Sequence, residues 1–112
     1  MKLIRAILQP HRLDLVRDAL KEIGVSGMTA YQAQGFGRQK GHKEIYRGAE
    51  YEIQFLPKMA IDIVVEDSNA DKACEVITNT ARTGNIGDGK IFVLNVEKAI
   101  RIRTGESGDS AL

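Results

Sequence analysis

The same order of hydrophobic patterns occurs twice in the chain, and this repeat limits the possible folds more than any other feature. In each half, a short apolar segment typical of a strand precedes apolar residues at helical spacing, a glycine that can end the helix, and a second strand-like segment. Two β-α-β units of this kind predict an α+β, ferredoxin-like βαββαβ sandwich, with both helices on one face of an antiparallel sheet. The expected strands cover residues 2–9, 27–36, 57–67 and 90–96, and the expected helices end at Gly24 and Gly84.

The second half gives the clearest prediction of core residues. Ile61, Ile63 and Val65 alternate along the strand and should share one face of the sheet. Asp67 or Ser68 can cap the helix that follows. The apolar stripe of that helix consists of Ala70, Ala73, Cys74, Ile77 and Ala81.

Several strands are apolar on both faces, which two helices on one side of the sheet do not explain. Leu3 and Ile7 lie opposite Ile4 and Leu8, and the segment "IFVL" has no polar face. An antiparallel sheet with one hydrated face should alternate more cleanly. We therefore expect the second face to be buried in a homo-oligomer, the alternative being a strand covered by the loops of its own chain.

A polar segment over about residues 38–54 separates the two halves. Connections of this length are uncommon in compact domains and are often functional. We expect a long protruding loop, with a hairpin as one possibility because Tyr51, Ile53 and Phe55 alternate. The pattern alone favours ordinary surface positions for Tyr46 and Tyr51.

The composition is that of an ordinary globular protein. At 112 residues the chain should form a single domain, residues 1–112, and its net charge of +1 gives no reason to expect nucleic acid or a membrane surface as partner. Cys74 is the only cysteine, so no internal disulfide can form. The apolar segment at the start of the sequence is too short for a signal peptide or a membrane span, and Arg5 interrupts it with a charge. We therefore expect a cytoplasmic protein without membrane insertion.

The segment "TGNIGDGKIF" resembles a phosphate-binding P-loop in its spacing but not in its context. Gly84, Gly89 and Lys90 fit G-x-x-x-x-G-K, yet the segment follows a helix, opens a strand, and has Ile91 where a P-loop has serine or threonine. It is either a plain turn or a backbone nest for an anion. Arg101 and Arg103, which share a face if extended, and the cationic segment "GFGRQKGH" favour a polyphosphate ligand.

No catalytic constellation accompanies these cationic segments. His11 and His42 have no cysteine or carboxylate partner at metal-ligand spacing, and Cys74 belongs to a core stripe. The sequence therefore predicts a binding protein and not an enzyme, with a slow nucleotide hydrolase as a less favoured reading. An RNA-binding ferredoxin-like module would need more exposed aromatic residues on its sheet.

Three segments together resemble the nitrogen regulatory P-II signal-transduction proteins: "GFGRQKGHKEIYRGAEYEIQFLPK", "ARTGNIGDGKIF" and "AIRIRTGE". The resemblance implies a homotrimer that binds ATP or ADP, Mg²⁺ and 2-oxoglutarate as effectors in clefts between subunits. It also implies that the long loop changes shape with the bound ligands and docks on targets, such as an ammonium channel, a uridylyltransferase or adenylyltransferase, or a sensor kinase. Such a protein senses nitrogen, carbon and energy status.

The resemblance also assigns residues to ligands. It implies a nucleotide loop over residues 82–90 and a C-terminal segment, residues 101–112, that reaches the neighbouring subunit's nucleotide. Lys58 would pair with the distal carboxylate of 2-oxoglutarate, Gln39 would hold Mg²⁺ and the 2-oxo acid together with Gly41, and Tyr51 would accept a uridylyl group. The implied nucleotide-binding residues are Thr29, Gly37, Arg38, Val64, Gly87, Asp88, Gly89, Lys90, Arg101 and Arg103.

Four positions depart from the family pattern. Gln9 stands where a basic residue is usual near the 2-oxoglutarate cleft, and Asp62 stands where a longer glutamate is common near the ribose. His11 replaces an aromatic residue, and Ala49 replaces the serine that some members phosphorylate. The changes at positions 9, 62 and 11 bear on ligand affinity, and they leave open an adenylate-charge sensor with no 2-oxoglutarate response. Ala49 excludes phosphorylation at that position.

Overall fold

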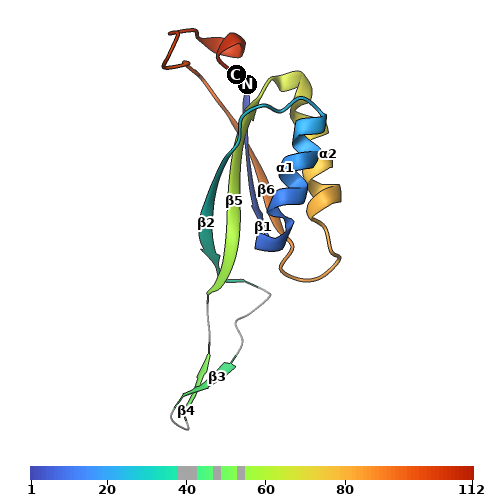
Figure 1. Cartoon of the computed structure of the whole chain (residues 1–112), viewed down its shortest axis with the longest axis vertical. Helices are drawn as coiled ribbons and strands as arrows, with labels where there is room; N and C mark the ends of the chain where they lie inside the picture. Colours follow the sequence, from blue (N-terminus) through green and yellow to red (C-terminus); the bar gives the residue numbers. More distant parts are fainter. Residues whose placement is uncertain (38–42, 47–48, 53–54) are drawn as a thin grey trace.

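The computed structural model describes residues 1–37, 43–46, 49–52 and 55–112, and it confirms the ferredoxin-like α+β fold. Four antiparallel strands form one sheet in the order β2-β5-β1-β6, and two helices lie side by side on one face of it (Figure 1). The strands are β1 (Lys2–Leu8), β2 (Thr29–Gly35), β5 (Leu56–Val65) and β6 (Gly89–Asn95), and the helices are α1 (Leu13–Glu22) and α2 (Asp67–Ala81).

The core lies between the helices and the sheet. Ile61, Ile63 and Val65 share the face of β5 that the helices cover, as the alternation predicts. Each isoleucine that leaves water completely contributes about 1.5–3 kcal/mol to folding. The expected stripe of α2 is also confirmed, except that Cys74 is only half-buried beside it. The other buried core residues are Ile4, Ala6 and Leu8 of β1 and Val16 and Leu20 of α1.

The helix ends agree with the sequence at one terminus and differ at another. Gly24 has a φ of +90° and its N–H donates to the carbonyl of Lys21, so it ends α1 as a glycine C-cap should. The expected cap of α2 by Asp67 or Ser68 is wrong, because Glu66 is the N-cap residue and its side chain makes no capping bond. Asp67 instead accepts a hydrogen bond from the amino group of Met1, at 2.8 Å. No helix in the described part of the chain is long and apolar enough to cross a membrane.

The face of the sheet opposite the helices stays partly open in a single chain. The strand register places Leu3, Arg5 and Ile7 of β1 on this open face, beside Phe92 and Leu94 of β6. Phe92 and Leu94 are each about half exposed, at 49% and 47%. Within the described part of the chain, no loop therefore covers Phe92 and Leu94 completely, and these apolar side chains remain accessible to another molecule.

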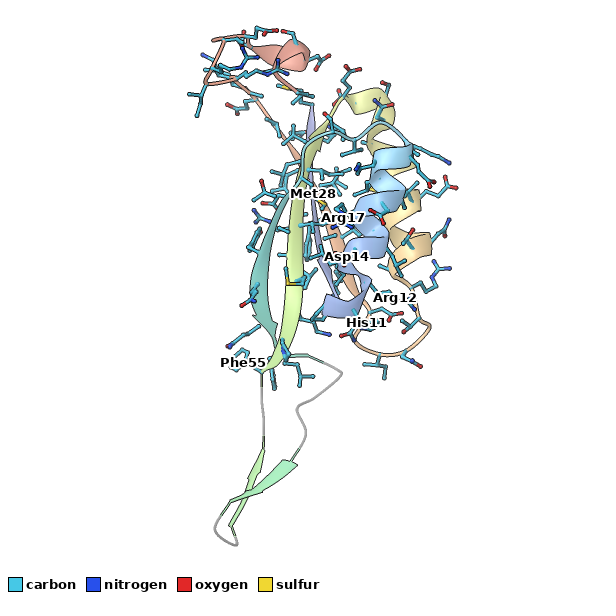
Figure 2. The ribbon with its side chains drawn as sticks, viewed as in Figure 1. His11, Arg12, Asp14, Arg17, Met28 and Phe55 are labelled. Atoms are coloured by element: carbon cyan, nitrogen blue, oxygen red, sulfur yellow. The ribbon has the colours of Figure 1, made fainter. Side chains whose placement is uncertain are left out.

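A second, small sheet projects from one end of the molecule. Strands β3 (Lys43–Tyr46) and β4 (Ala49–Glu52) pair as an antiparallel hairpin, which confirms that the expected loop contains one. The hairpin extends the chain to 59 Å along its longest axis (Figure 1). Phe55 lies at the end of the main sheet from which the hairpin projects (Figure 2). Its ring centroid lies 6.0 Å from that of Phe36, and both side chains are exposed.

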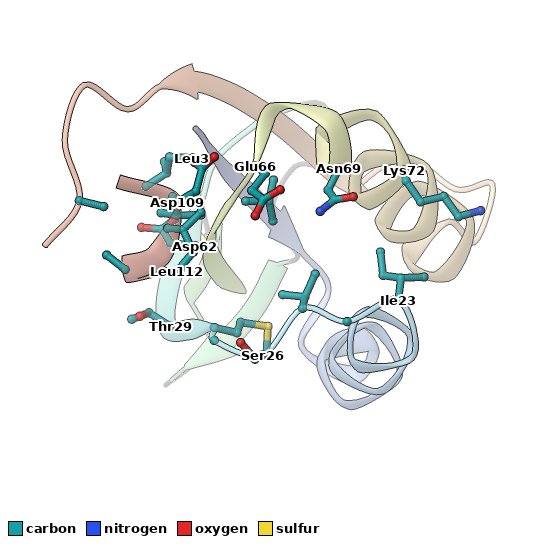
Figure 3. A pocket seen from close by; sticks show the side chains of 18 residues that line it. Leu3, Ile23, Ser26, Thr29, Asp62, Glu66, Asn69, Lys72, Asp109 and Leu112 are labelled. Atoms are coloured by element: carbon teal, nitrogen blue, oxygen red, sulfur yellow. The ribbon is translucent and has the colours of Figure 1, made fainter. Parts of the chain in front are cut away.

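The C-terminal segment folds back at the opposite end of the sheet (Figure 1). Residues 102–104 form a turn, which the N–H of Gly105 closes by donating to the carbonyl of Arg101 at 2.8 Å. The extended arrangement considered for Arg101 and Arg103 is therefore not adopted. A short 3-10 helix, Gly108–Ala111, follows. This segment forms one wall of a pocket of about 670 Å³ between the end of β5 and the loop after α1 (Figure 3).

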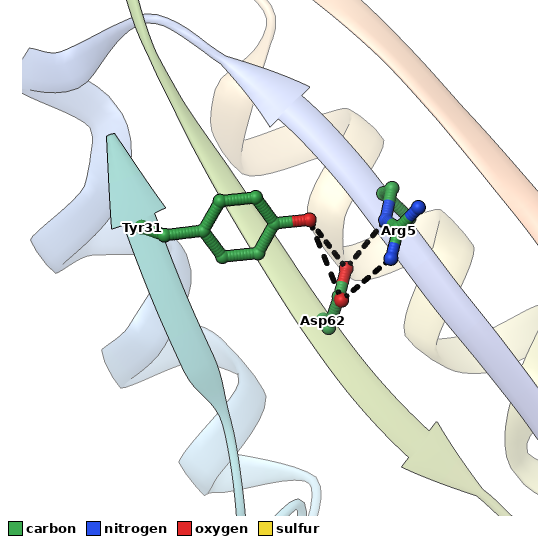
Figure 4. A network of polar contacts seen from close by, with 3 residues as sticks. All are labelled: Arg5, Tyr31 and Asp62. Atoms are coloured by element: carbon green, nitrogen blue, oxygen red, sulfur yellow. Dashed lines mark hydrogen bonds and ion pairs between the residues drawn. The ribbon is translucent and has the colours of Figure 1, made fainter. Parts of the chain in front are cut away.

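One polar network crosses three strands on the open face (Figure 4). The carboxylate of Asp62 on β5 accepts two hydrogen bonds from the guanidinium of Arg5 on β1, each 2.9 Å long. The hydroxyl of Tyr31 on β2 donates to the same carboxylate at 3.3 Å. The bond to Arg5 is the main reason why the pKa of Asp62 lies below its usual value.

Replacement of Gly89 by alanine should destabilise the fold far more than the same change at Gly84. A Cβ at position 89 would lie 1.7 Å from the carbonyl oxygen of Ile7, whereas a Cβ at position 84 meets nothing within 4 Å. Both glycines have positive φ, so Gly84→Ala should cost about 1–2 kcal/mol for backbone strain alone. Gly89→Ala adds a backbone clash and should cost at least about 3 kcal/mol. Chemical denaturation of the two variants measures the difference, and equal losses would contradict it.

The hydrogen bonds to Asp62 should make the free energy of unfolding depend on pH. Because the pKa of Asp62 is lower in the folded state than in the unfolded chain, its contribution is complete above pH of about 5 and is lost as the pH falls through the folded pKa. Asp62→Asn should lower the free energy of unfolding at pH 7 by about 1 kcal/mol and reduce its decline below pH of about 4. Urea denaturation across this range measures both effects, with Asp18→Asn on α1 as the control.

Candidate functional site

The residues expected to bind ligands gather on the open face of the sheet and at its two ends. Thr29 of β2, Lys58 and Val64 of β5, and Lys90 of β6 all point to the side without helices, as the strand register requires. No helix competes for this face in the described part of the chain, so side chains there can meet a ligand or another protein molecule.

Within one chain these residues form two separate groups. Thr29 and Val64 line the 670 Å³ pocket, together with the carboxylate-bearing Asp62 (Figure 3). The glycines and Lys90 lie at the other end of the sheet. Val64 pairs with Leu3 and Gly89 pairs with Leu8, so the groups are about 17 Å apart along β1. A single chain does not bring them together.

The loop between α2 and β6 has the backbone of an anion nest, although it does not follow a P-loop strand. Gly84, Gly87 and Gly89 all have positive φ, between +88° and +107°. Such conformations turn successive N–H groups toward a common centre. Lys90 follows at once and is exposed, so its charge is available beside these amides.

The carboxylate of Asp88 points back into this loop. One oxygen accepts the backbone N–H groups of Thr83 and Gly84, at 2.8 and 2.9 Å, and the other accepts the hydroxyl of Thr83. The hydrogen bond from the hydroxyl of Thr83 contributes most to holding the pKa of Asp88 below its usual value, and the two backbone bonds add to this effect. The charge of Arg12 lowers the pKa further. Arg12 lies at the start of α1 (Figure 2).

Lys58 connects the sheet to the same loop. It is only 8% exposed although it lies on the open face, and its Nζ donates to the carbonyl of Gly87 at 2.7 Å. Gly35 on the neighbouring strand leaves room for the lysine, since a Cβ there would lie 3.2 Å from its Cγ. Burial lowers the pKa of Lys58, and the negative charge of Asp88 opposes this effect. A buried ammonium of this kind suits an anionic ligand.

The two arginines of the C-terminal segment lie at the pocket end of the sheet. Arg101 donates to the carbonyl of Leu112 at 3.1 Å and pairs with Glu106 at 3.6 Å. Arg103 is exposed, and Ile102 between them is 98% exposed. In one chain neither arginine lies near the glycine loop, since their segment and that loop occupy opposite ends of the sheet (Figure 1).

Some expected site residues lie outside the described residues. These are Arg38, Gln39 and Gly41. Gly37 is described and exposed just beyond β2, with open space around its Cα. Tyr51 lies in β4 of the hairpin, opposite Glu44 of β3. Among the described residues, no group of three His, Cys, Asp or Glu side chains could hold a metal ion.

Sequence reasoning missed three residues with a structural part in these sites: Thr83, Arg5 and Tyr31. A signal for Thr83 existed, because a threonine and an aspartate that flank a glycine-rich turn often bond across it. Arg5 and Tyr31 reach Asp62 only through the sheet register, so no local pattern could reveal them.

Comparison with known proteins identifies the family of the chain and agrees with the fold. The sequence profile of the family described as nitrogen regulatory protein P-II matches residues 1–106. Nitrogen regulatory protein P-II of Rhizobium meliloti (strain 1021) is 58% identical over 112 residues, that of Haemophilus influenzae (strain ATCC 51907 / DSM 11121 / KW20 / Rd) is 57% identical, and nitrogen regulatory protein P-II 1 of Escherichia coli (strain K12) is 58% identical, each match covering 100% of both chains. The chain therefore belongs to the nitrogen regulatory protein P-II family.

Proposed function

We propose that the chain senses energy, carbon and nitrogen status by binding ATP or ADP and 2-oxoglutarate between three copies of itself, and passes this information to target proteins through residues 38–54. Membership of the P-II family gives the chain a regulatory role in signal transduction and implies interaction with targets. Family membership alone does not establish that the chain binds these ligands or forms a homotrimer, so both are part of the proposal. The observation that carries them is the open sheet face, which holds two incomplete groups of ligand residues at opposite ends.

The open face supports assembly. Phe92 and Leu94 expose apolar surface that a second copy can cover, and burial of such surface contributes roughly 25 cal/mol per Å². A cleft between copies also unites the two groups if each copy supplies a different end of its sheet. In a homotrimer this arrangement gives three equivalent clefts.

Each group suits one part of a nucleotide. The backbone amides of Gly87 and Gly89 and the ammonium of Lys90 match a phosphate chain. Gly37 and Arg38 are proposed to bind the same phosphates. Arg101 and Arg103 from the neighbouring copy would approach the same phosphates, and Arg101 would exchange its bonds to Leu112 and Glu106 for them. Thr29 and Val64, in the wall of the 670 Å³ pocket, would hold the adenine.

The buried ammonium of Lys58 suits the distal carboxylate of 2-oxoglutarate. A carboxylate would add to the favourable effect of Asp88 on the ammonium and offset the cost of its burial. Gln39 would hold Mg²⁺ through its oxygen, with backbone from Gly41 beside the 2-oxo acid. Because Mg²⁺ would bridge nucleotide and 2-oxo acid, 2-oxoglutarate binding should depend on ATP.

The hairpin β3–β4 is the element that would contact targets. It stands clear of the main sheet, so it can enter a partner without disturbing the core (Figure 1). An ammonium channel, a uridylyltransferase or adenylyltransferase, and a sensor kinase are the proposed partners, in the cytoplasm or at a membrane channel. Tyr51 in β4 is the proposed site of uridylylation. The role needs no catalytic step by the chain itself.

A second candidate is an adenylate-charge sensor with no response to 2-oxoglutarate. Gln9 favours it, because this residue directly follows β1, whose last residue pairs with Gly89. Most related proteins are expected to place a cation there, and a neutral side chain gives weaker attraction to a dicarboxylate.

Calorimetric titration with 2-oxoglutarate and Mg²⁺, with and without saturating ATP, tests the proposal. Heat of binding only in the presence of ATP is the expected result, since the two ligands share a metal ion and a cleft. ATP binding with no response to 2-oxoglutarate would favour the second candidate. A chain that binds no adenine nucleotide would contradict both.

Lys58→Met should separate ligand binding from folding. The variant should lose the response to 2-oxoglutarate and keep ATP affinity within about threefold, because only the dicarboxylate would pair with the ammonium. Its free energy of unfolding should fall by less than about 1 kcal/mol, or rise, since a buried charge is replaced by an apolar chain of similar length. Calorimetry and urea denaturation measure the two effects, and equal loss of both ligands would contradict the assignment.

A further inference from the structure

The carboxylate of Asp88 accepts three hydrogen bonds inside its own loop. Both of its oxygens accept hydrogen bonds, and all three donors belong to Thr83 and Gly84, at the start of the loop. Because the pKa of Asp88 is lowered, the group is ionised at neutral pH and acts only as an acceptor. The carboxylate of Asp88 therefore already occupies these donors of the loop in the absence of a ligand.

This internal anion limits which amides a phosphate could use. The N–H groups of Thr83 and Gly84 converge on Asp88, so they are not available to a ligand while this contact persists. A carboxylate that instead faced a phosphate would repel it. Turned inward, its charge is balanced by the two N–H dipoles and the hydroxyl, and the repulsion is reduced.

Lys58 holds the same stretch of backbone from the other side. Its ammonium binds the carbonyl of Gly87, and the peptide bond from Gly87 to Asp88 is trans. In a trans peptide the carbonyl and the following N–H point in opposite directions. The N–H of Asp88 therefore points away from Lys58.

We infer that Asp88 is a positioning residue: its carboxylate, held by Thr83, keeps residues 83–88 in the shape in which the remaining amides of the loop bind the phosphates, and it contacts neither phosphate nor Mg²⁺. This inference rests on the proposed nucleotide binding. It differs from the expectation that Asp88 itself lines the phosphates, and it gives Thr83 a role that the sequence did not reveal.

Three variants test the inference by calorimetric titration of ATP, with Mg²⁺ and separately with EDTA. Asp88→Asn removes the negative charge that the two N–H groups and the hydroxyl bind, and Thr83→Val removes the hydroxyl with little change of shape. Each should weaken ATP binding roughly tenfold, by the same factor with and without Mg²⁺. Thr83→Ser keeps the hydroxyl and should restore most of the affinity. Asp18→Asn makes the same charge change on the exposed surface of α1 and should bind as the wild type does.

Amide hydrogen exchange in the nucleotide-free protein adds a second readout. The N–H groups of Thr83 and Gly84 should exchange faster in Asp88→Asn than in the wild type, while amides of the sheet should be unchanged, which shows that the variant is folded. Unchanged or tighter ATP binding by Asp88→Asn would overturn the inference, and so would a loss confined to the titration with Mg²⁺, which would mean that the carboxylate contacts the ion. A wild-type chain that binds no ATP would overturn the proposed function, and the inference with it.

Discussion

Two helices can cover only one face of a four-stranded sheet, and the remaining features of this protein depend on what happens at the other face. The helix side is an ordinary apolar core built from aliphatic residues of β1, β5, α1 and α2. The open side carries exposed Phe92 and Leu94, an ion pair between Arg5 and Asp62, and the buried ammonium of Lys58. Such a mixture is unusual for a surface that only meets water, and it is typical of a surface that meets another protein.

Periodicity and glycine placement were sufficient to predict the fold. The alternation of Ile61, Ile63 and Val65 and the glycine stop at Gly24 are local features, and both predictions were confirmed. The cap of α2 was predicted wrongly because serine and aspartate have high N-cap preference, whereas here Asp67 is recruited by the amino group of Met1, which is adjacent only in the folded chain.

The candidate site was less predictable because its contacts join distant parts of the sequence. Motifs identified the glycine loop, but they did not show that Asp88 turns inward or that Lys58 holds Gly87. The two arginines illustrate the same limit. Their spacing suggests a shared face in a strand. The N–H of Gly105 instead donates to the carbonyl of Arg101 and closes a turn, in which alternate residues no longer lie on one face.

The close approach of Gly89 to the carbonyl of Ile7 has an evolutionary consequence. Because a side chain at this position would collide with β1, selection for folding alone retains the glycine, whether or not a ligand is ever bound. A related chain that bound no ligand would still need Gly89 in order to fold, so this residue is a poor marker of ligand binding. Thr83 and Asp88 are not part of the core, so folding alone does not require them. Whether related chains keep or lose this pair together would therefore be a better marker of a change in the function of the loop.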